Sequence, residues 1–491
     1  MRTYLCVYLG STFLALLGTP VVIWLARRIG AVDHPCARSV HQRPIPRIGG
    51  VAIFVSSMCL ILAVLYLHND IGEAFRAVRL QVTALLGSAA FIFLLGLVDD
   101  LRHLPAGFKF LAELAAAGTL CLVGVRIDEI GLVDGYAISL GWLGCPLTLL
   151  WVVGITNAVN LSDGLDGLAA GISAITCGVI AALAITSDNP MMAVFALSLV
   201  GSLSGFLVFN FNPARIFMGD CGSLFLGYTI AASSVMCMTK SSAVVGLTLP
   251  ALALGIPIFD TLFSMLRRYQ ERRSLFASDR GHFHHRLLDL GLRQRHAVIL
   301  IYLFTLLCTG LGLLMMAQRD LTSLAIFGGA LLLLLVEFHV VGVIRPRQTL
   351  IRLRERYRLS QQERGQQRVF EDAQLLFGQV RDGGQWWQAV GEAAGQMGFA
   401  WVSLTTTSGD GRTKTESWRA SEAQGDRSHL LLITVPWGDG RQTGRKQEFQ
   451  IAIRINGSLE DACRRACFFG RLLDNPGVSV PRQFALGDPA C

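Results

Sequence analysis

Charged residues are scarce in this 491-residue chain: Asp, Glu, Lys and Arg together make up 16%, whereas hydrophobic residues make up 52%. Soluble globular domains carry about a quarter of charged residues, so the scarcity argues against that class. Together with a positive mean hydropathy, it predicts a multi-spanning membrane protein. The net charge of +8 is interpreted as a signal for orientation and for the lipid surface, so no nucleic-acid partner is expected.

Paired cysteines are also lacking. The twelve cysteines include no C-x-x-C motif and no paired spacing. Their pattern argues against a disulfide framework and against a structural zinc site. Cys463 and Cys467 are one helical turn apart, which is more typical of packing than of metal binding.

Long apolar runs, by contrast, are abundant, and we predict eleven membrane-spanning helices and an all-α polytopic fold. A cleavable signal peptide is the alternative for the first run. Only Arg2 precedes that run, and Arg27 and Arg28 follow it, which favours an uncleaved span. The predicted spans are 4–26, 50–68, 80–98, 108–125, 138–156, 168–187, 191–210, 222–239, 243–266, 297–317 and 321–344.

The arginines predict the orientation. If successive loops alternate sides, most loop arginines fall into one set of loops. The positive-inside rule places this set in the cytoplasm and the N-terminus outside. The polar loops of this set are therefore expected to face the cytoplasm.

After about residue 345 the composition becomes polar, so we expect a membrane domain over 1–345 and a cytoplasmic α+β domain over 346–491. The tail shows no recognisable catalytic motif, and a regulatory or partner-binding module is the favoured interpretation. Its predicted helices are 349–380, 385–397 and 459–473, and its predicted strands are 399–406, 429–436 and 448–455.

Five polar segments interrupt the apolar part, and the predicted topology puts all of them on the cytoplasmic side. They are residues 34–50, 99–109, 157–167, 209–223 and 278–291. The third, "NAVNLSDGLDG", spaces its carboxamides and carboxylates three residues apart. A step of three turns a helical side chain by about 300°, so these groups spread over half the circumference and predict a polar cup at a helix end. They are Asn157, Asn160, Asp163 and Asp166.

The acids of these segments predict a metal site. Asp99 and Asp100 are adjacent at a membrane border, where they repel each other unless a cation or a proton relieves them. With Asp163, Asp166 and Asp220 on the same face, the oxygen ligands point to a hard ion, Mg²⁺ or Mn²⁺. Glycines flank Asp220 and predict a constrained loop, with an N-cap of the eighth span as the alternative.

The segment "HFHHR" gathers His282, His284, His285 and Arg286. Imidazoles and a guanidinium donate hydrogen bonds and positive charge, which suits a phosphate or a polar sugar. Zinc binding and a solvated loop are the alternatives. Acids for a metal, basic groups for phosphate and nearby hydrocarbon together predict transfer of a phosphorylated group from a soluble nucleotide to a lipid phosphate.

Five motifs resemble those of the polyprenyl-phosphate N-acetylhexosamine-1-phosphate transferases, relatives of the phospho-N-acetylmuramoyl-pentapeptide transferase. The resemblance covers residues 1 to about 345. It implies a UDP-activated amino sugar and undecaprenyl phosphate as substrates, UMP and a lipid-diphosphate sugar as products, and Mg²⁺ or Mn²⁺ as cofactor. It also implies the bacterial inner membrane as the location. The motifs are "PRIGG" (46–50), "DD" (99–100) with Lys109 downstream, "NAVNLSDGLDGLA" (157–169), "FMGDCGSLFLG" (217–227) and "HFHHRL" (282–287).

The resemblance also implies roles for single residues. Asp220 is similar to the metal-binding aspartate, with Asn160 as a metal or diphosphate partner. Asp99 is similar to the base that activates the lipid phosphate, Asp100 is its neighbour in the motif, and Lys109 contacts phosphate.

The other two motifs concern the donor. Asp163 and Asp166 resemble the nucleotide-side acids, with Asn157 beside them. The histidine-rich segment resembles the loop for the sugar and the diphosphate. Arg286 favours an N-acetylhexosamine donor, because the pentapeptide enzymes tend to an all-His run followed by an acid. Arg38-Ser39 stands where relatives often have Arg-Lys, so a phosphate contact from that loop is unsupported.

Several alternatives stay open. A muramoyl-pentapeptide donor is one. A transporter would need acids within the spans and related halves, whereas the acids cluster at one interface and no motif recurs. A scaffold serving the tail would leave the polar segments unexplained. The identity of the N-acetylhexosamine, the receiving cell-surface glycan, a homodimer and a regulatory partner of the tail are not decided by the sequence.

Overall fold

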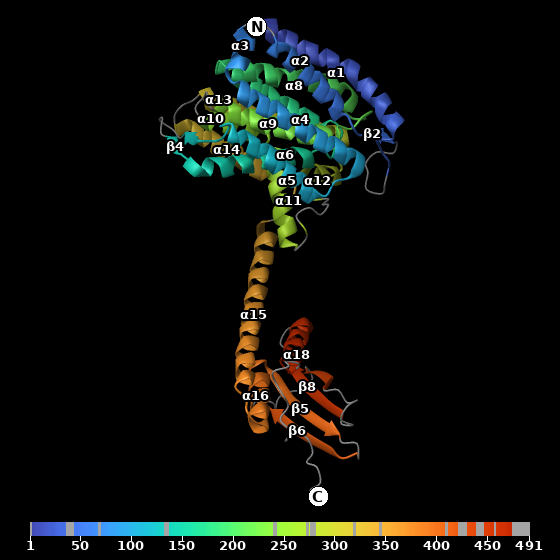
Figure 1. Cartoon of the computed structure of the whole chain (residues 1–491), viewed down its shortest axis with the longest axis vertical. Coiled ribbons are helices and arrows are strands. Elements are labelled where there is room, and N and C mark those ends of the chain that lie inside the picture. Colours follow the sequence, from blue (N-terminus) through green and yellow to red (C-terminus); the bar gives the residue numbers. More distant parts are fainter. Residues whose placement is uncertain are drawn as a thin grey trace. The chain divides into compact units, whose positions relative to one another are not determined.

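In a computed structural model, the chain divides into two compact units, Met1–Pro346 and Arg347–Cys491. Figure 1 shows the first as a bundle of helices and the second as a sheet accompanied by helices. The structure describes residues 2–35, 44–66, 70–131, 137–238, 243–271, 274, 281–317, 321–342, 346–407, 411–420, 430–437, 446–455 and 458–473.

The first unit is helical, with two short antiparallel strand pairs in its connections. β1 (Val32–Asp33) pairs with β2 (Ile45–Pro46), and β3 (Glu129–Gly131) pairs with β4 (Ala137–Ser139). Its α-helices are α1 (Arg2–Ile29), α2 (Gly50–Leu65), α3 (Asp70–Ala77), α4 (Arg79–Arg102), α5 (Ala106–Leu122), α6 (Gly144–Leu161), α7 (Leu168–Thr186), α8 (Pro190–Asn210), α9 (Gly219–Met238), α10 (Ala243–Ala253), α11 (Gly255–Gln270), α12 (Phe283–Asp289), α13 (Gln294–Ala317) and α14 (Leu321–Val340).

Six helices of the described residues are long and apolar enough to cross a membrane, and a bent pair could be a seventh. The chain is therefore a multi-pass helical membrane protein. Every predicted apolar stretch overlaps a helix. The count of eleven spans and the outside N-terminus stay predictions.

The stretch 243–266 is not one continuous helix, and its crossing of the membrane as a single span stays a prediction. Two helices, α10 and α11, occupy this stretch, and their axes are bent by 74° at the break. Pro257 explains the break, because it has no N–H to donate to the carbonyl of Ala253. The amide of Ile258 does bond its helical partner, Leu254 O, at 2.9 Å, so the ladder resumes one residue later.

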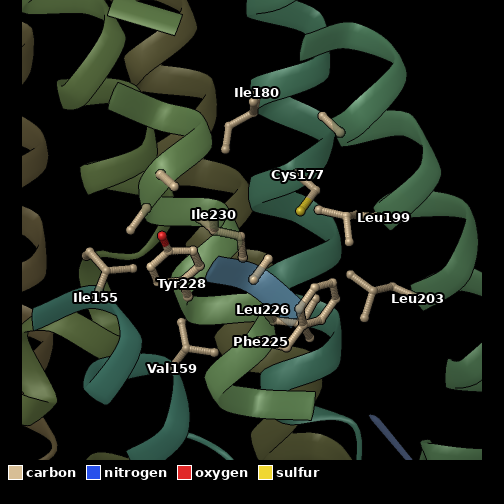
Figure 2. Close-up of a cluster of buried hydrophobic side chains, with 14 of the residues drawn as sticks. Ile155, Val159, Cys177, Ile180, Leu199, Leu203, Phe225, Leu226, Tyr228 and Ile230 are labelled. Atoms are coloured by element: carbon tan, nitrogen blue, oxygen red, sulfur yellow. The ribbon is translucent and has the colours of Figure 1, made fainter. Parts of the chain in front are cut away.

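Helix α9 forms the centre of the first unit. Every residue from Cys221 to Cys237 is buried, as expected for a helix that is apolar on all sides. Figure 2 shows side chains of α6, α7 and α8 gathered around Phe225, Leu226 and Ile230 of α9. The hydroxyl of Tyr228 bonds to the carbonyl of Ala116 at 3.1 Å, so its polar end is satisfied inside the core.

The second unit contains one antiparallel sheet of four strands in the order β6-β5-β8-β7. The predicted three helices and three strands of the tail are confirmed, but β6 was not predicted. This edge strand is polar and mostly exposed, so it lacks the alternation that marks a half-buried strand. The elements are α15 (Pro346–Gly378), α16 (Gly383–Gln396), β5 (Phe399–Thr407), β6 (Thr413–Arg419), β7 (Leu430–Trp437), β8 (Lys446–Arg454) and α18 (Leu459–Leu473).

Aromatic rings fill the core of the second unit between the sheet and its helices. The ring of Phe449 on β8 lies 6.3 Å from Trp386 of α16 and 6.2 Å from Phe469 of α18. Phe469 in turn contacts Phe399 of β5 at 5.1 Å. One side chain of the central strand therefore joins both helices to the sheet.

We expect residues 347–473, produced without the membrane unit, to unfold cooperatively in urea. Phe449→Ala should lower the free energy of unfolding by about 3–5 kcal/mol, because it empties a fully buried aromatic site. Leu432→Ala is the matched control on the neighbouring strand: its side chain is 66% exposed, so the loss should stay within about 0.5 kcal/mol. Tryptophan fluorescence would follow both, and equal losses would contradict the core described above.

Candidate functional site

Asp100, near the end of α4, is held by the start of α9. Its Oδ1 accepts a hydrogen bond from the backbone N–H of Asp220, and its Oδ2 accepts one from Cys221, both at 3.0 Å. The first N–H groups of a helix lack partners within the helix, and a carboxylate both satisfies them and suits the helix dipole. Asp100 is thus a cap supplied by another helix, and it positions Asp220.

Asp220 lies in the first turn of α9, so its predicted placement on a loop before the eighth span is wrong. The helix begins earlier than the apolar pattern indicates, because the polar residues of its first turn are capped by Asp100 rather than solvated. The sharp turn is at Gly219, whose φ is +74°. This left-handed value is accessible to glycine at little cost.

Lys109, in the first turn of α5, lies between two carboxylates. Its ammonium donates to Asp99 Oδ2 at 2.7 Å and to Asp220 Oδ2 at 2.9 Å. The other oxygen of Asp99 accepts the backbone N–H of Leu104 at 2.5 Å. One cation therefore holds together the acid predicted as a base and the acid predicted to bind metal.

The residues before α2 lie directly on the chain that leads into α9. The amides of Gly49 and Gly50 donate to the carbonyls of Phe217 and Met218 at 2.9 and 2.8 Å, and Phe217 N donates to Pro46 O at 2.7 Å. The "PRIGG" and "FMGDCGS" motifs thus form a short backbone ladder. Arg38 and Ser39, the departure from the family pattern, lie outside the described residues.

Glycines in these two motifs are required by close packing. A Cβ built on Gly50 would lie 2.2 Å from the backbone N of Gly222, and one built on Gly222 would lie 2.2 Å from Cγ of Met218. No real Cβ atom is found so close to another heavy atom. These positions therefore exclude any side chain.

The stretch 157–167 does lie at a helix end, as predicted. Asn157 and Asn160 are in the last turn of α6, and the acids follow in the connection to α7. The amide of Asn157 donates to the Glu113 carboxylate of α5 and to Val153 O. Asn157 therefore faces the neighbouring helix.

The two aspartates of this stretch have different surroundings. Asp166 Oδ2 accepts from Asn212 Nδ2 at 2.8 Å and from Ala214 N at 3.0 Å, which ties the stretch to the connection before α9. Burial, followed by the charges of three neighbouring carboxylates, raises the pKa of Asp163 to about 8. These neighbours are Asp220, Asp100 and Asp166.

The histidine-rich segment is anchored by Asp260 of α11. Asp260 Oδ1 accepts the backbone N–H of Phe283 at 2.8 Å, and its Oδ2 lies 3.0 Å from His282 Nδ1. The rings of His282 and His284 are nearly parallel, with centroids 5.7 Å apart, and His285 follows with its centroid 4.5 Å from His284. Three imidazoles thus stand in a row.

His284 joins this row to the stretch 157–167. A Cβ on Gly164 would lie 2.4 Å from His284 Nε2, so the imidazole packs directly on that glycine. Burial lowers the pKa of His284 to about 3, so the ring is neutral at neutral pH. Arg286 is partly exposed, and its buried Nε has no hydrogen-bond partner in the described part of the chain.

The contacts described above bring all five polar segments together. The first touches the fourth through the backbone ladder, the second touches the fourth through Asp100 and Lys109, and the third touches the fourth through Asp166 and the fifth through Gly164. The predicted site residues that make these contacts are Asp99, Asp100, Lys109, Asp166, Asp220 and His284. The roles predicted for them stay predictions.

Sequence reasoning missed two carboxylates that serve the site, Glu113 and Asp260. Each is a lone acid in an apolar run, and each is buried. An acid in a spanning stretch is costly and points to function, so that signal was present. Glu113, Asp260 and Glu337 are further acids within the apolar helices, and the first two contact predicted site residues, Asn157 and His282.

Within the described ranges, no three His, Cys, Asp or Glu side chains are arranged to hold a metal ion. The charges nevertheless suit a divalent cation. Asp99 and Asp220 share the ammonium of Lys109, and Asp100 binds the backbone of Asp220. After burial, the charges of these neighbouring acids contribute to the raised pKa of Asp163. Oxygen-rich sites of this kind fit Mg²⁺ or Mn²⁺.

Comparison with known proteins agrees with the geometry. A family model described as glycosyl transferase family 4 matches residues 82–238. The chain is 41% identical over 299 residues, 60% of its length and 80% of the relative's, to a probable undecaprenyl-phosphate N-acetylglucosaminyl 1-phosphate transferase of Bacillus subtilis. The chain belongs to glycosyl transferase family 4.

Two further relatives of this family 4 chain are named for different sugar donors. A decaprenyl-phosphate N-acetylglucosaminephosphotransferase of Mycobacterium leprae is 34% identical over 334 residues, 62% of this chain and 81% of that protein. A phospho-N-acetylmuramoyl-pentapeptide-transferase of Bacillus mycoides is 35% identical over only 210 residues, 40% of this chain and 63% of that protein. The N-acetylglucosamine relatives thus match over more of the family 4 unit.

Gly219→Ala should lower the thermal stability of the detergent-solubilised protein by several degrees or prevent folding. Its Cβ would lie 2.0 Å from Arg47 O and 2.6 Å from Asp100 Oδ2, at a positive φ. Gly178→Ala in α7 is the control: nothing lies within 4 Å of its Cβ, and alanine favours a helix, so stability should hold or rise. Equal melting temperatures would show that the turn into α9 is not constrained.

Proposed function

We propose that this chain transfers an N-acetylhexosamine 1-phosphate, most simply N-acetylglucosamine 1-phosphate, from its UDP derivative to undecaprenyl phosphate. UMP and a lipid-linked diphospho-sugar are the products, and the latter begins a cell-surface glycan. The observation that carries the proposal is the placement of Lys109 between Asp99 and Asp220. Membership of the family and the names of its relatives support the substrates.

The lipid acceptor enters from the side of α4 and α5. Large apolar side chains next to Asp99 and Lys109 are exposed: Leu101 is 50% exposed, Phe108 55% and Leu111 64%. Such a surface suits a polyprenyl chain, whose apolar tail stays in the bilayer while its phosphate reaches the polar assembly. The acceptor phosphate competes for the ammonium of Lys109, because its oxygens accept strong charge-assisted hydrogen bonds.

Asp99 then acts as the general base. As Lys109 turns to the phosphate, Asp99 Oδ2 is released and accepts the proton of the lipid phosphate. The deprotonated phosphate oxygen attacks the phosphorus attached to the sugar, a new P–O bond forms, and the bond to the UMP oxygen breaks. Leu104 N–H keeps Asp99 oriented through its other oxygen.

A divalent cation, Mg²⁺ or Mn²⁺, would be held by Asp220 with Asn160 as the proposed partner. When bound, it offsets the negative charge that collects as phosphate approaches diphosphate. Asp100 holds Asp220 in place through the first amides of α9. Asp163 and Asp166 are proposed to contact the nucleotide side.

The donor's sugar and diphosphate bind at the histidine-rich segment. His284 is neutral and packed, so it shapes the site, whereas Arg286 supplies a charge for the diphosphate. The proposed topology places this assembly on the cytoplasmic face of the inner membrane, where UDP-sugars are available. It has eleven spans, the N-terminus outside and the second unit inside, where that unit regulates the enzyme or binds a partner.

The decisive assay follows UMP release from UDP-N-acetylglucosamine, UDP-N-acetylgalactosamine and UDP-N-acetylmuramoyl-pentapeptide with undecaprenyl phosphate. Turnover of the last alone would overturn the proposal. Asp220→Asn should abolish most activity and weaken Mn²⁺ binding, because it removes one charge from a hard-cation site. Asp99→Asn should lose about 10²–10⁴-fold in turnover, the scale of general-base catalysis, and retain metal-dependent donor binding.

The metal-binding measurement separates the two acids. An Asp220→Asn protein that binds Mn²⁺ normally and turns over at a near wild-type rate would remove Asp220 from the site. Loss of donor binding in Asp99→Asn would instead move that acid from the acceptor to the donor.

Arg286→Ala should raise the KM for the UDP-sugar and leave the KM for undecaprenyl phosphate unchanged, because Nε of this guanidinium has no hydrogen-bond partner among the described residues. A loss of one charge-assisted hydrogen bond corresponds to about a tenfold change or more. Arg293→Ala, a neighbouring basic residue, is the control for general loss of positive charge. An effect confined to the lipid substrate would contradict the assignment.

A further inference from the structure

Asp260 is a buried acid that the proposed reaction does not use. It lies on α11, in the apolar sequence "GIPIFDTLFS", and its residue is 4% exposed. A carboxylate taken out of water at this depth is costly unless it is hydrogen-bonded. Both of its oxygens are in fact engaged, by Phe283 N at 2.8 Å and by His282 Nδ1 at 3.0 Å.

The contact with His282 determines where that imidazole carries its proton. An ionised carboxylate can only accept hydrogen bonds, so the hydrogen of the pair must be on His282 Nδ1. A neutral imidazole has one N–H, and Nε2 is then left with its lone pair. Ser264 Oγ lies 3.3 Å from the same Nδ1. This oxygen accepts a hydrogen bond from Arg267 at 3.1 Å, which holds it near that nitrogen.

A bare Nε2 has a consequence for the ligand. It can accept from a hydroxyl or an amide N–H, but diphosphate oxygens are acceptors themselves and gain nothing from it. The diphosphate is therefore bound by Arg286. The part of the UDP-sugar that contacts His282 must carry an N–H or O–H group. In an N-acetylhexosamine these are the sugar hydroxyls and the acetamido N–H.

We propose that Asp260 is a positioning residue that fixes the proton of His282 on Nδ1 and so presents Nε2 as an acceptor to a hydroxyl or the amide of the donor sugar. The kinetic part of this inference rests on the proposed function. The tautomer itself does not, because it concerns two residues of the chain without any substrate.

A purely structural role is the alternative. Asp260 also holds the backbone of Phe283, whose ring packs 4.6 Å from Phe338, so its removal could simply loosen the segment. Asp260→Asn separates the two roles. Its Oδ1 can still accept from Phe283 N, but its amide donates toward His282 Nδ1, which forces the proton onto Nε2 and reverses the polarity presented to the sugar.

The first test uses histidine labelled with ¹⁵N in the detergent-solubilised protein. The His282 signals, assigned by their loss in His282→Gln, should show the proton on Nδ1 in the wild type and on Nε2 in Asp260→Asn. A wild-type His282 protonated on Nε2, alone or in addition to Nδ1, would overturn the proposal. This result needs no second variant, so it stands even if Asp260→Asn fails to fold.

The second test is kinetic. Asp260→Asn should raise the KM for the UDP-sugar by about 10–100-fold. In this variant Nε2 of His282 carries the proton, so it faces the N–H or O–H group of the sugar as a second hydrogen-bond donor. The KM for undecaprenyl phosphate should not change, and Asp260→Glu, which keeps the carboxylate, should recover part of the loss. In a His282→Gln background the same substitution should cost less than about twofold, because both changes act on one contact.

Glu337→Gln is the matched control. Glu337 is another buried acid of the apolar helices, 7% exposed, and both of its oxygens lack a hydrogen-bond partner among the described residues. Its isosteric change should leave both KM values as they are. An equal loss in Glu337→Gln, or an undiminished loss in the His282→Gln background, would overturn the proposal. Absence of turnover in the wild type would refute the proposed function and leave the tautomer result to decide the role of Asp260.

Discussion

The two hydrogen bonds between Asp100 and the start of α9 determine where most of the site can lie. They join the end of one long helix to the beginning of another, and the second of these helices is the buried centre of the membrane unit. Because α9 is enclosed on all sides, its position is set by packing along its whole length. The hydrogen bonds from Asp100 therefore hold Asp220, in the first turn of α9, in a fixed position.

The site combines this rigid frame with an unbalanced set of charges. The carboxylate of Asp100 is engaged in capping α9, whereas the ammonium of Lys109 binds both Asp99 and Asp220. A single ammonium shared by two acids is a contact that an incoming phosphate or metal ion can rearrange, since either offers a stronger partner. The frame therefore stays fixed while the ionic contacts change with the ligand.

Much of this arrangement could be predicted from the sequence, because loops that alternate across a membrane would put all five polar segments on one face. The five polar segments were expected on one face, and they do touch one another. Asp260 and Glu113 were missed for a physical reason: each is a single polar residue in an apolar run, so neither alters local periodicity. The bend before α11 depends on one missing amide, that of Pro257, and β6 is a polar edge strand with no hydrophobic signal. These features come from tertiary contacts, which pattern reasoning does not include.

The close approach of Gly50 to Gly222 affects how the motifs of this chain are to be understood. At both positions the space left is that of a hydrogen atom. Two segments that lie more than 150 residues apart in the chain are thereby fastened backbone to backbone, without a side chain, an ion pair or a metal between them. Glycine is needed at these two positions because the two backbones touch there. The chemistry belongs to the few side chains that this backbone contact holds in place.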